Sequence, residues 1–220
     1  MVFLSYVLNE MTPTYGNRNK FEQIKKSDIS KGDVANDTSI STTVHIGTHI
    51  DMPYHFYENG QTIEDYEADF WRFKKPLVLE IQQEELIINE ELIRKLSEIE
   101  DAKYDILIVK TGICNKRSEE VFWKENYGFH SDIYDFLIEK FPMIRVIGFD
   151  SISVSSLTDR MLGRESHRRF LNPEKPILLL EDMDLRNINE TIKFKEIIVS
   201  PLRIVKCDGL PCTVFGVMDD

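Results

Sequence analysis

The stretch that decides the fold and the chemistry of this chain is residues 45–55, His-Ile-Gly-Thr-His-Ile-Asp-Met-Pro-Tyr-His. Three of the five histidines in the chain fall within it, together with an aspartate. His45, His49, Asp51 and His55 occupy odd positions, so in an extended chain their side chains project to the same side. In a helix His45 and His49 would align, but the other two would turn away. The pattern therefore predicts an extended segment with one polar face, backed by the apolar residues between these four.

Imidazole and carboxylate side chains that share one face indicate a metal site. Residues four apart on a straight strand lie about 13 Å apart, at roughly 3.3 Å per residue, whereas histidine and aspartate bind a metal at about 2.0–2.2 Å. The backbone must therefore bend for His45 and His49 to share an ion. Gly47 lies between them and Pro53 lies beyond Asp51, and both residue types suit departures from regular pairing. We expect a bent or bulged strand at Gly47 and an ion such as Zn²⁺, Mn²⁺ or Fe²⁺ rather than Ca²⁺ or Mg²⁺.

The composition excludes several other classes of protein. Of the 220 residues 42% are hydrophobic, which is enough apolar surface for a globular core. With 38 acidic and 27 basic residues the net charge is −11, which argues against nucleic acid or an anionic membrane as the main partner. The longest apolar run is far shorter than the roughly 18 residues of a membrane-spanning helix. The first residues show no secretory signal and the three cysteines form no CxxC pair, so we expect a cytoplasmic protein with reduced thiols.

Hydrophobic periodicity indicates both helices and strands. It predicts helices within 84–100 and 131–141, the second with Ser131 as the N-cap candidate and Pro142 as the stop. Residues 1–10 could open with a strand, 11–39 are typical of a long loop or ragged hairpin, and 40–57 of extended chain. Short apolar runs predict strands at 104–110, 145–149, 177–180, 197–199, 202–205 and 213–217. Because no repeat or linker interrupts the chain, we expect residues 1–220 to form a single α/β domain, with a mixed β-sheet and a few packed helices.

Residues 45–55 resemble the HxGTHxDxPxH signature of the cyclase family of metal-dependent hydrolases, which includes bacterial kynurenine formamidase, and they match it at every fixed position. The resemblance extends over most of the chain. It continues in Leu4-Ser5 with Thr12-Pro13-Thr14-Tyr15, Val109-Lys110-Thr111-Gly112, Ile147-Gly148-Phe149-Asp150-Ser151 and Asp208-Gly209-Leu210-Pro211. It implies the cyclase, or kynurenine formamidase-like, fold, which is one α/β domain with a mixed sheet, usually in an oligomer.

The resemblance also implies a role for each polar residue of the motif. His45, His49 and Asp51 correspond to metal ligands, and Asp51 would bridge where two ions bind. His55 corresponds to the general acid/base. The implied cofactor is one or two divalent ions, with Zn²⁺ favoured and Mn²⁺ as the alternative.

In the family a later histidine and glutamate complete the site. Here the candidates are His167 and Glu181, although the interval between them is a little longer than usual and contains 172–176, Asn-Pro-Glu-Lys-Pro. A carboxylate at the end of an apolar strand needs a reason to be near the interior, which favours Glu181. Asp182 is its neighbouring rival, and His130 is interpreted as a structural histidine.

Two further groups bear on the substrate. Formamidases of the family often carry Trp where this chain has Tyr15, whose ring could still stack on an aromatic substrate, so Tyr15 is our candidate substrate-binding residue. The alternative is an exposed loop tyrosine. Arg164, Arg168 and Arg169 either meet a substrate carboxylate or form a solvated basic face of a helix, and we favour the second interpretation.

The resemblance predicts a metal-dependent amide hydrolase, with N-formylkynurenine as the leading substrate and kynurenine and formate as products. His55 would move a proton to the leaving nitrogen, a role suited to an imidazole that titrates near neutrality. Two alternatives stay open: a hydrolase of cyclic amides such as isatin, and a metal-binding member of the fold without activity. The expected partners are a small-molecule amide and further copies of the chain, in a dimer or tetramer, with no nucleic acid and no membrane.

Overall fold

The computed structural model describes residues 1–82 and 84–219. A mixed β-sheet runs through its centre in the strand order β5-β12-β13-β4-β11-β10-β8-β6, and β1 also pairs with β13. The strands of this sheet are β1 Val2–Phe3, β4 His49–Asp51, β5 Arg72–Phe73, β6 Pro76–Glu80, β8 Ile106–Lys110, β10 Val146–Phe149, β11 Leu178–Glu181, β12 Phe194–Pro201 and β13 Gly209–Met218. Two separate strand pairs are β2 Glu22–Ser27 with β3 Asp37–Ser41, and β7 Ile87–Ile88 with β9 Gly128–Phe129. The α-helices are α1 Glu90–Ser97, α2 Val121–Lys124, α3 Asp132–Lys140 and α4 Arg160–Phe170.

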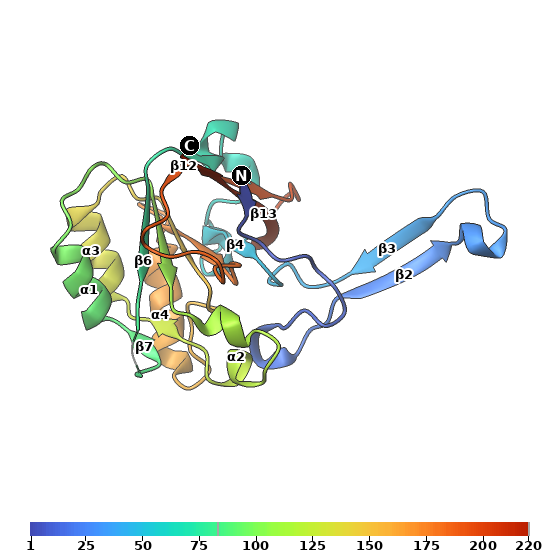
Figure 1. Cartoon of the computed structure of the whole chain (residues 1–220), viewed down its shortest axis with the longest axis horizontal. Coiled ribbons are helices and arrows are strands. Elements are labelled where there is room, and N and C mark those ends of the chain that lie inside the picture. Colours follow the sequence, from blue (N-terminus) through green and yellow to red (C-terminus); the bar gives the residue numbers. More distant parts are fainter. Residues whose placement is uncertain (83, 220) are drawn as a thin grey trace.

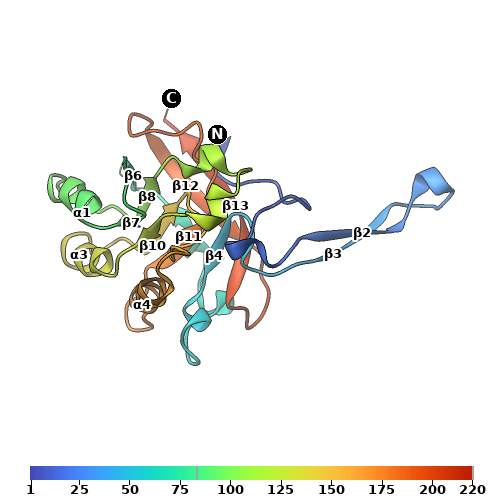
Figure 2. The same ribbon diagram turned by 90° about the horizontal axis from the view of Figure 1, so that it is seen from below.

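One half of the sheet is parallel, and its inner strands are buried on both faces. β6, β8, β10 and β11 are parallel neighbours, and every residue of β8 and β10 is buried. A strand that is buried on both faces needs apolar side chains at successive positions, which is why these strands appear as continuous apolar runs in the sequence. Helices α1, α3 and α4 lie along one face of the sheet (Figure 2). The other half, from β11 through β4, β13 and β12 to β5, is antiparallel, so the predicted α/β class with a mixed sheet is confirmed.

Most of the predicted elements are present, and both predicted helices differ from expectation in one detail. The helix expected within 84–100 is the shorter α1, which follows β7. Ser131 stands at the N-cap of α3, but its side chain makes no capping hydrogen bond, because its hydroxyl instead lies 3.4 Å from Glu165 Oε1. None of the helices in the described residues has the length and apolar character needed to cross a bilayer.

The strand predicted at 202–205 is wrong. The antiparallel pairing of β12 with β13 ends at Pro201 opposite Cys212, and the chain then leaves the sheet in a turn. Leu202 and Val205 are consequently exposed, at 51% and 72%. A short apolar run predicts a strand only if a partner strand lies beside it, and here none does among the described residues.

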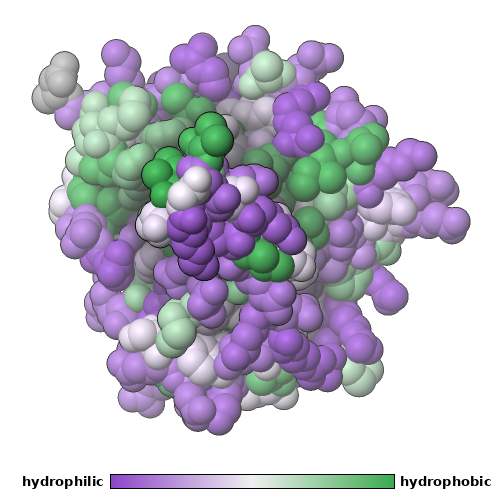
Figure 3. Space-filling model, turned by 90° about the vertical axis from the view of Figure 1, so that its right-hand side faces the viewer, coloured by the Kyte–Doolittle hydropathy of each residue, from purple (hydrophilic) through white to green (hydrophobic). Residues whose placement is uncertain are grey.

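Strands β2 and β3 form an arm, residues 22–41, that projects from the body of the molecule (Figures 1 and 2). This is the hairpin alternative predicted for 11–39. The two strands pair with one another, and nearly all their side chains are exposed. Figure 3 looks at the face from which the arm projects, where a largely hydrophilic surface carries separate hydrophobic patches beside the arm. An isolated two-stranded hairpin is at best marginally stable in water.

Candidate metal centre

Strand β4 lies between β11 and β13 at the middle of the sheet and carries the centre of the site. Its register places His49 opposite Glu181 of β11, and directly opposite residues project from the same face of a sheet. Asp51, two residues on, shares that face. His49 Nε2 therefore lies 3.4 Å from Glu181 Oε2 and 3.4 Å from Asp51 Oδ1, and all three side chains are buried.

The chain bends before β4, and the bend returns His45 to the same site. Gly47 has φ +57°, in the left-handed region that glycine adopts without strain, and a Cβ atom there would clash with the Leu8 side chain. His45 Nδ1 consequently lies 2.8 Å from Asp51 Oδ1. The predicted bend at Gly47 is confirmed. The extended segment predicted for 40–57 is wrong outside Asp37–Ser41 and His49–Asp51, because the chain turns on both sides of β4.

A second turn, Pro53–His55, brings His55 back over the site. His55 Nδ1 lies 3.1 Å from Asp208 Oδ2, and His45 Nε2 lies 2.9 Å from the same oxygen. The sequence alone did not identify Asp208 as a site residue. Asp208 was noted there only as part of the segment 208–211, which resembles the family. The following Gly209 makes the approach possible, because a Cβ atom there would lie 2.5 Å from His45 Cε1.

His167 reaches the cluster from helix α4. Its Nε2 lies 3.5 Å from Asp51 Oδ2, while its Nδ1 donates to Gly163 O at 2.8 Å. His49 is oriented in the same way, with Nδ1 donating to Gly47 O at 2.8 Å. A backbone carbonyl that holds one ring nitrogen is the usual support of a metal-binding histidine, since it aims the other nitrogen at the ion.

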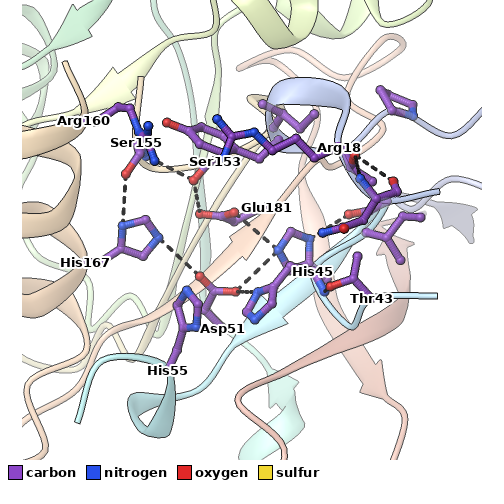
Figure 4. A pocket seen from close by; sticks show the side chains of 18 of the residues that line it. Arg18, Thr43, His45, Asp51, His55, Ser153, Ser155, Arg160, His167 and Glu181 are labelled. Atoms are coloured by element: carbon purple, nitrogen blue, oxygen red, sulfur yellow. Dashed lines mark hydrogen bonds and ion pairs between the residues drawn. The ribbon is translucent and has the colours of Figure 1, made fainter. Parts of the chain in front are cut away.

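Glu181 completes the floor of the site at the end of β11. Its Oε1 accepts a hydrogen bond from Val154 N at 2.7 Å, which leaves Oε2 facing His49. Figure 4 shows the side chains of His45, Asp51, His167 and Glu181 converging on one pocket. The structure thus brings together residues that lie more than a hundred positions apart in the sequence.

The donor set fits a divalent ion. His49 Nε2 is buried and has no hydrogen-bond partner among the described residues, although two carboxylates face it. Ligand atoms of His49, Asp51 and Glu181 lie within 4.8 Å of one another, and so do those of His45, Asp51 and His55. The two groups share Asp51. Nitrogen and carboxylate oxygen donors of this kind suit first-row transition metals and zinc.

Comparison with known proteins decides the family. The cyclase family model, described as "Putative cyclase", matches residues 2–156. The chain is 31% identical to a kynurenine formamidase of Bacillus cereus (strain ATCC 10987 / NRS 248) over 174 residues, which is 78% of this chain and 75% of that protein. The chain belongs to the cyclase family. This membership agrees with the predicted class, a metal-dependent hydrolase that acts on amide bonds.

A second relative and a solved structure also resemble the chain. A kynurenine formamidase from a second Bacillus cereus strain (ATCC 14579) is 28% identical over 94% of this chain and 92% of its own length. Among solved structures, an isatin hydrolase from Labrenzia aggregata superposes with a TM-score of 0.80 at 18% identity, covering 99% of this chain and 93% of that one. At that identity the likeness shows the fold, which confirms the predicted cyclase-type architecture.

The electrostatics of this cyclase-family site favour a bound cation. Burial alone would lower the pKa of His45, but the carboxylates of Asp51 and Asp208 outweigh it and raise that pKa to about 9. The pKa values of His49 and His167 are raised in the same way, against burial. Burial likewise opposes ionisation of Asp51, yet the surrounding histidines hold its pKa well below the usual range. The raised pKa values favour protonation of these histidines in the metal-free chain, where the added positive charge balances that of the carboxylates.

Asp182 and His130, the other acidic and histidine residues considered for the site, lie outside the donor cluster. Asp182 is buried, but it faces Arg117, whose Nη2 lies 2.6 Å from Asp182 Oδ2. His130 lies 3.3 Å from Asp132, outside the cluster. Neither joins the donor groups, which is the outcome that the sequence interpretation favoured.

A cavity of about 330 Å³ opens above the cluster, a size suited to a small aromatic ligand. Tyr15, the candidate substrate-binding residue, lines it from the 3₁₀ turn Tyr15–Asn17. Of the three arginines considered at the sequence level, Arg164 lines the cavity. Arg168 does not, and Arg169 pairs with Asp135 outside it.

Proposed function

We propose that this protein hydrolyses an aryl formamide, with N-formylkynurenine as the leading substrate, to an aromatic amine and formate. The observation that carries the proposal is the buried donor group of His49, Asp51 and Glu181, with His45 against Asp51, at the floor of a cavity of about 330 Å³. The kynurenine formamidases that resemble the chain at about 30% identity support the choice of substrate.

We propose zinc as the ion, held by His45, His49, Asp51, His167 and Glu181 in a site for one or two ions. When bound, the ion supplies Lewis acidity, which polarises the amide carbonyl and lowers the pKa of water. The protein holds the ligand atoms in place through backbone contacts, such as that of Glu181 Oε1 with Val154 N. This support means that the donors need little rearrangement when the ion binds.

The same proposal makes His55 the general acid/base. Asp208 Oδ2 accepts a hydrogen bond from His55 Nδ1, which fixes the ring and leaves Nε2 free to hold a proton. His55 would take a proton from the attacking water and pass it to the leaving nitrogen. Its side chain is 28% exposed, more than those of His49 and His167, as a group that must reach substrate requires.

Hydrolysis of N-formylkynurenine by the metal-free protein, reloaded with zinc or manganese, tests the proposal. We expect kynurenine and formate in equal amounts, at a rate proportional to metal content, and loss of turnover with chelator. Isatin in parallel tests the cyclic-amide alternative. Metal-loaded protein that turns over neither compound would contradict the proposal and leave the inactive metal-binding alternative.

We further propose that the single domain of residues 1–220 works as a homo-oligomer, a dimer or tetramer, in the cytoplasm. The projecting arm supports association, because Ile24, Ile29, Val34 and Ile40 are exposed on it. The free thiols of the chain, none of them in a disulfide among the described residues, suit a reducing compartment.

A further inference from the structure

Three arginines stand on the rim of the metal cavity. Arg160 and Arg164 are four residues apart on α4 and therefore share a face of that helix. Arg18 comes from the other side, just after the turn Tyr15–Asn17. Figure 4 shows Arg18 and Arg160 entering from opposite sides of the pocket, with Glu181 between them.

The protein itself does not neutralise these three guanidinium groups. In residues 1–82 and 84–219, no carboxylate oxygen lies within 4.0 Å of their nitrogens. Most other arginines do have such a partner: Arg72, Arg94, Arg117, Arg145, Arg169 and Arg186. Asp51 and Glu181 at the cavity floor do not pair with these arginines either, because their carboxylates face the histidines.

Arg160 also borders the wall on which an aromatic substrate would lie. It interacts with the side chain of Tyr15, whose pKa burial raises and the arginine charge partly lowers again. Tyr15 in turn donates a hydrogen bond to Ser156 O at 3.4 Å. The rim therefore combines the aromatic ring of Tyr15, held by its hydrogen bond to Ser156 O, with the positive charge of the arginines.

We propose that Arg18, Arg160 and Arg164 form an anion subsite for a carboxylate of the substrate. The substrate class is then an aryl formamide that carries a carboxylate away from the scissile amide. Guanidinium groups bind carboxylates through paired, charge-assisted hydrogen bonds, and Arg cannot lose its charge near neutral pH. The inference rests on the proposed function, because the scissile amide must lie at the metal donors for the rest of the substrate to reach the rim.

Turnover of a charge-matched pair of substrates tests the subsite. The zinc-loaded protein is assayed with 4-formamidobenzoate and with its neutral methyl ester. We expect kcat/KM to be at least about tenfold higher for the carboxylate. The double variant Arg160→Gln/Arg164→Gln should lose that preference, mainly through KM, because kcat/KM should fall far more for the carboxylate than for the ester. The single variant Arg18→Gln should lose part of it.

Arg168→Gln is the matched control. Arg168 lies on the same helix and lacks a carboxylate partner among the described residues. It does not line the metal cavity, but a neighbouring surface depression that Arg164 also borders. This variant should keep the full preference for the carboxylate. A loss in Arg168→Gln equal to that in the double variant would overturn the subsite, because general surface charge would then explain the effect.

Binding separates this inference from the proposed function. Calorimetric titration of the zinc-loaded protein with 4-acetamidobenzoate and its methyl ester needs no turnover. Tighter binding of the carboxylate, lost in the double variant, would support the subsite even if no formamide were hydrolysed, in which case the proposed function alone would fail. Equal binding of acid and ester would overturn the subsite, because the carboxylate would then make no favourable contact. A preference for the acid that the double variant retains would also overturn it, because the carboxylate would then contact another group, such as the metal.

Discussion

Asp51 is the residue on which both donor groups depend. One carboxylate oxygen faces His45 and His49, and the other faces His167. We expect Asp51→Asn, which keeps the shape but removes the charge, to abolish stoichiometric metal binding, because loss of a shared ligand leaves neither group complete. Metal analysis of the purified variant checks this. Asp132→Asn, at an exposed aspartate beside His130, is the matched control and should retain full metal. Full occupancy in Asp51→Asn would refute the ligand assignment.

His55 has a different expected behaviour from the buried histidines. If it moves protons, His55→Ala should keep its metal and melting temperature while turnover falls by roughly 10²–10⁴-fold. Metal content, melting temperature and turnover, measured on one preparation, distinguish the roles. Metal lost together with activity would make His55 a ligand, and reduced stability with normal turnover per folded molecule would make it structural.

Protons must leave the site when the metal enters. In the metal-free chain the pKa of His45 is raised to about 9, so its ring is protonated at pH 7. A metal ligand must be deprotonated, so binding at pH 7 should release about one proton or more, and affinity should rise with pH until His45 is neutral, above about pH 9. Calorimetry in buffers of different ionisation enthalpy measures this release. Absence of any release at pH 7 would count against His45 as a ligand.

At the scale of elements, the bend at Gly47 determines whether His45 can reach the site. Gly47→Ala places a side chain in the left-handed region and against Leu8, so we expect a stability loss of about 1–3 kcal/mol and weaker metal binding. Gly32, at φ +96° with open space around it, is the matched control at the tip of the arm. Gly32→Ala carries the backbone strain but should leave metal affinity unchanged. Denaturant unfolding and metal titration of both variants test the pair, and an unaltered affinity in Gly47→Ala would show that the bend is dispensable.

The arm differs from the other elements in that nearly all the side chains of its two strands are exposed. We expect replacement of residues 22–41 by a short Gly-Ser turn to leave the melting temperature within a few degrees, because the arm contributes little to the core. The same variant should fall from the oligomer to the monomer. Light scattering after gel filtration compares it with the full chain. A full chain that is already monomeric, or a variant that keeps the oligomer, would show that the arm is not the contact.

At the scale of the whole molecule, the sheet order makes one site from three distant segments. β4 pairs with β11 on one side and with β13 on the other, so Glu181 and Asp208 approach the histidine motif from opposite directions. Strands β8, β10 and β11 of the parallel half are fully buried, which holds the registers in place. The donors therefore need little rearrangement to receive an ion.

The sequence by itself determined the local chemistry. The i, i+2 spacing of His49 and Asp51 places both on one face, Gly47 permits the bend, and the continuous apolar runs predict the buried strands. These properties depend on a residue and its immediate backbone, so a pattern of a few residues carries them. His167 and Glu181 were predicted only through family resemblance.

Only the tertiary structure decided which distant groups meet. Asp208 reaches His45 and His55 because β13 is the neighbour of β4, and the apolar run at 202–205 stays outside the sheet because no strand lies beside it. The arginine rim likewise joins Arg18 to α4 across the cavity. The choice of neighbouring strands follows from burying the faces of the whole sheet at once, and no local pattern contains that information.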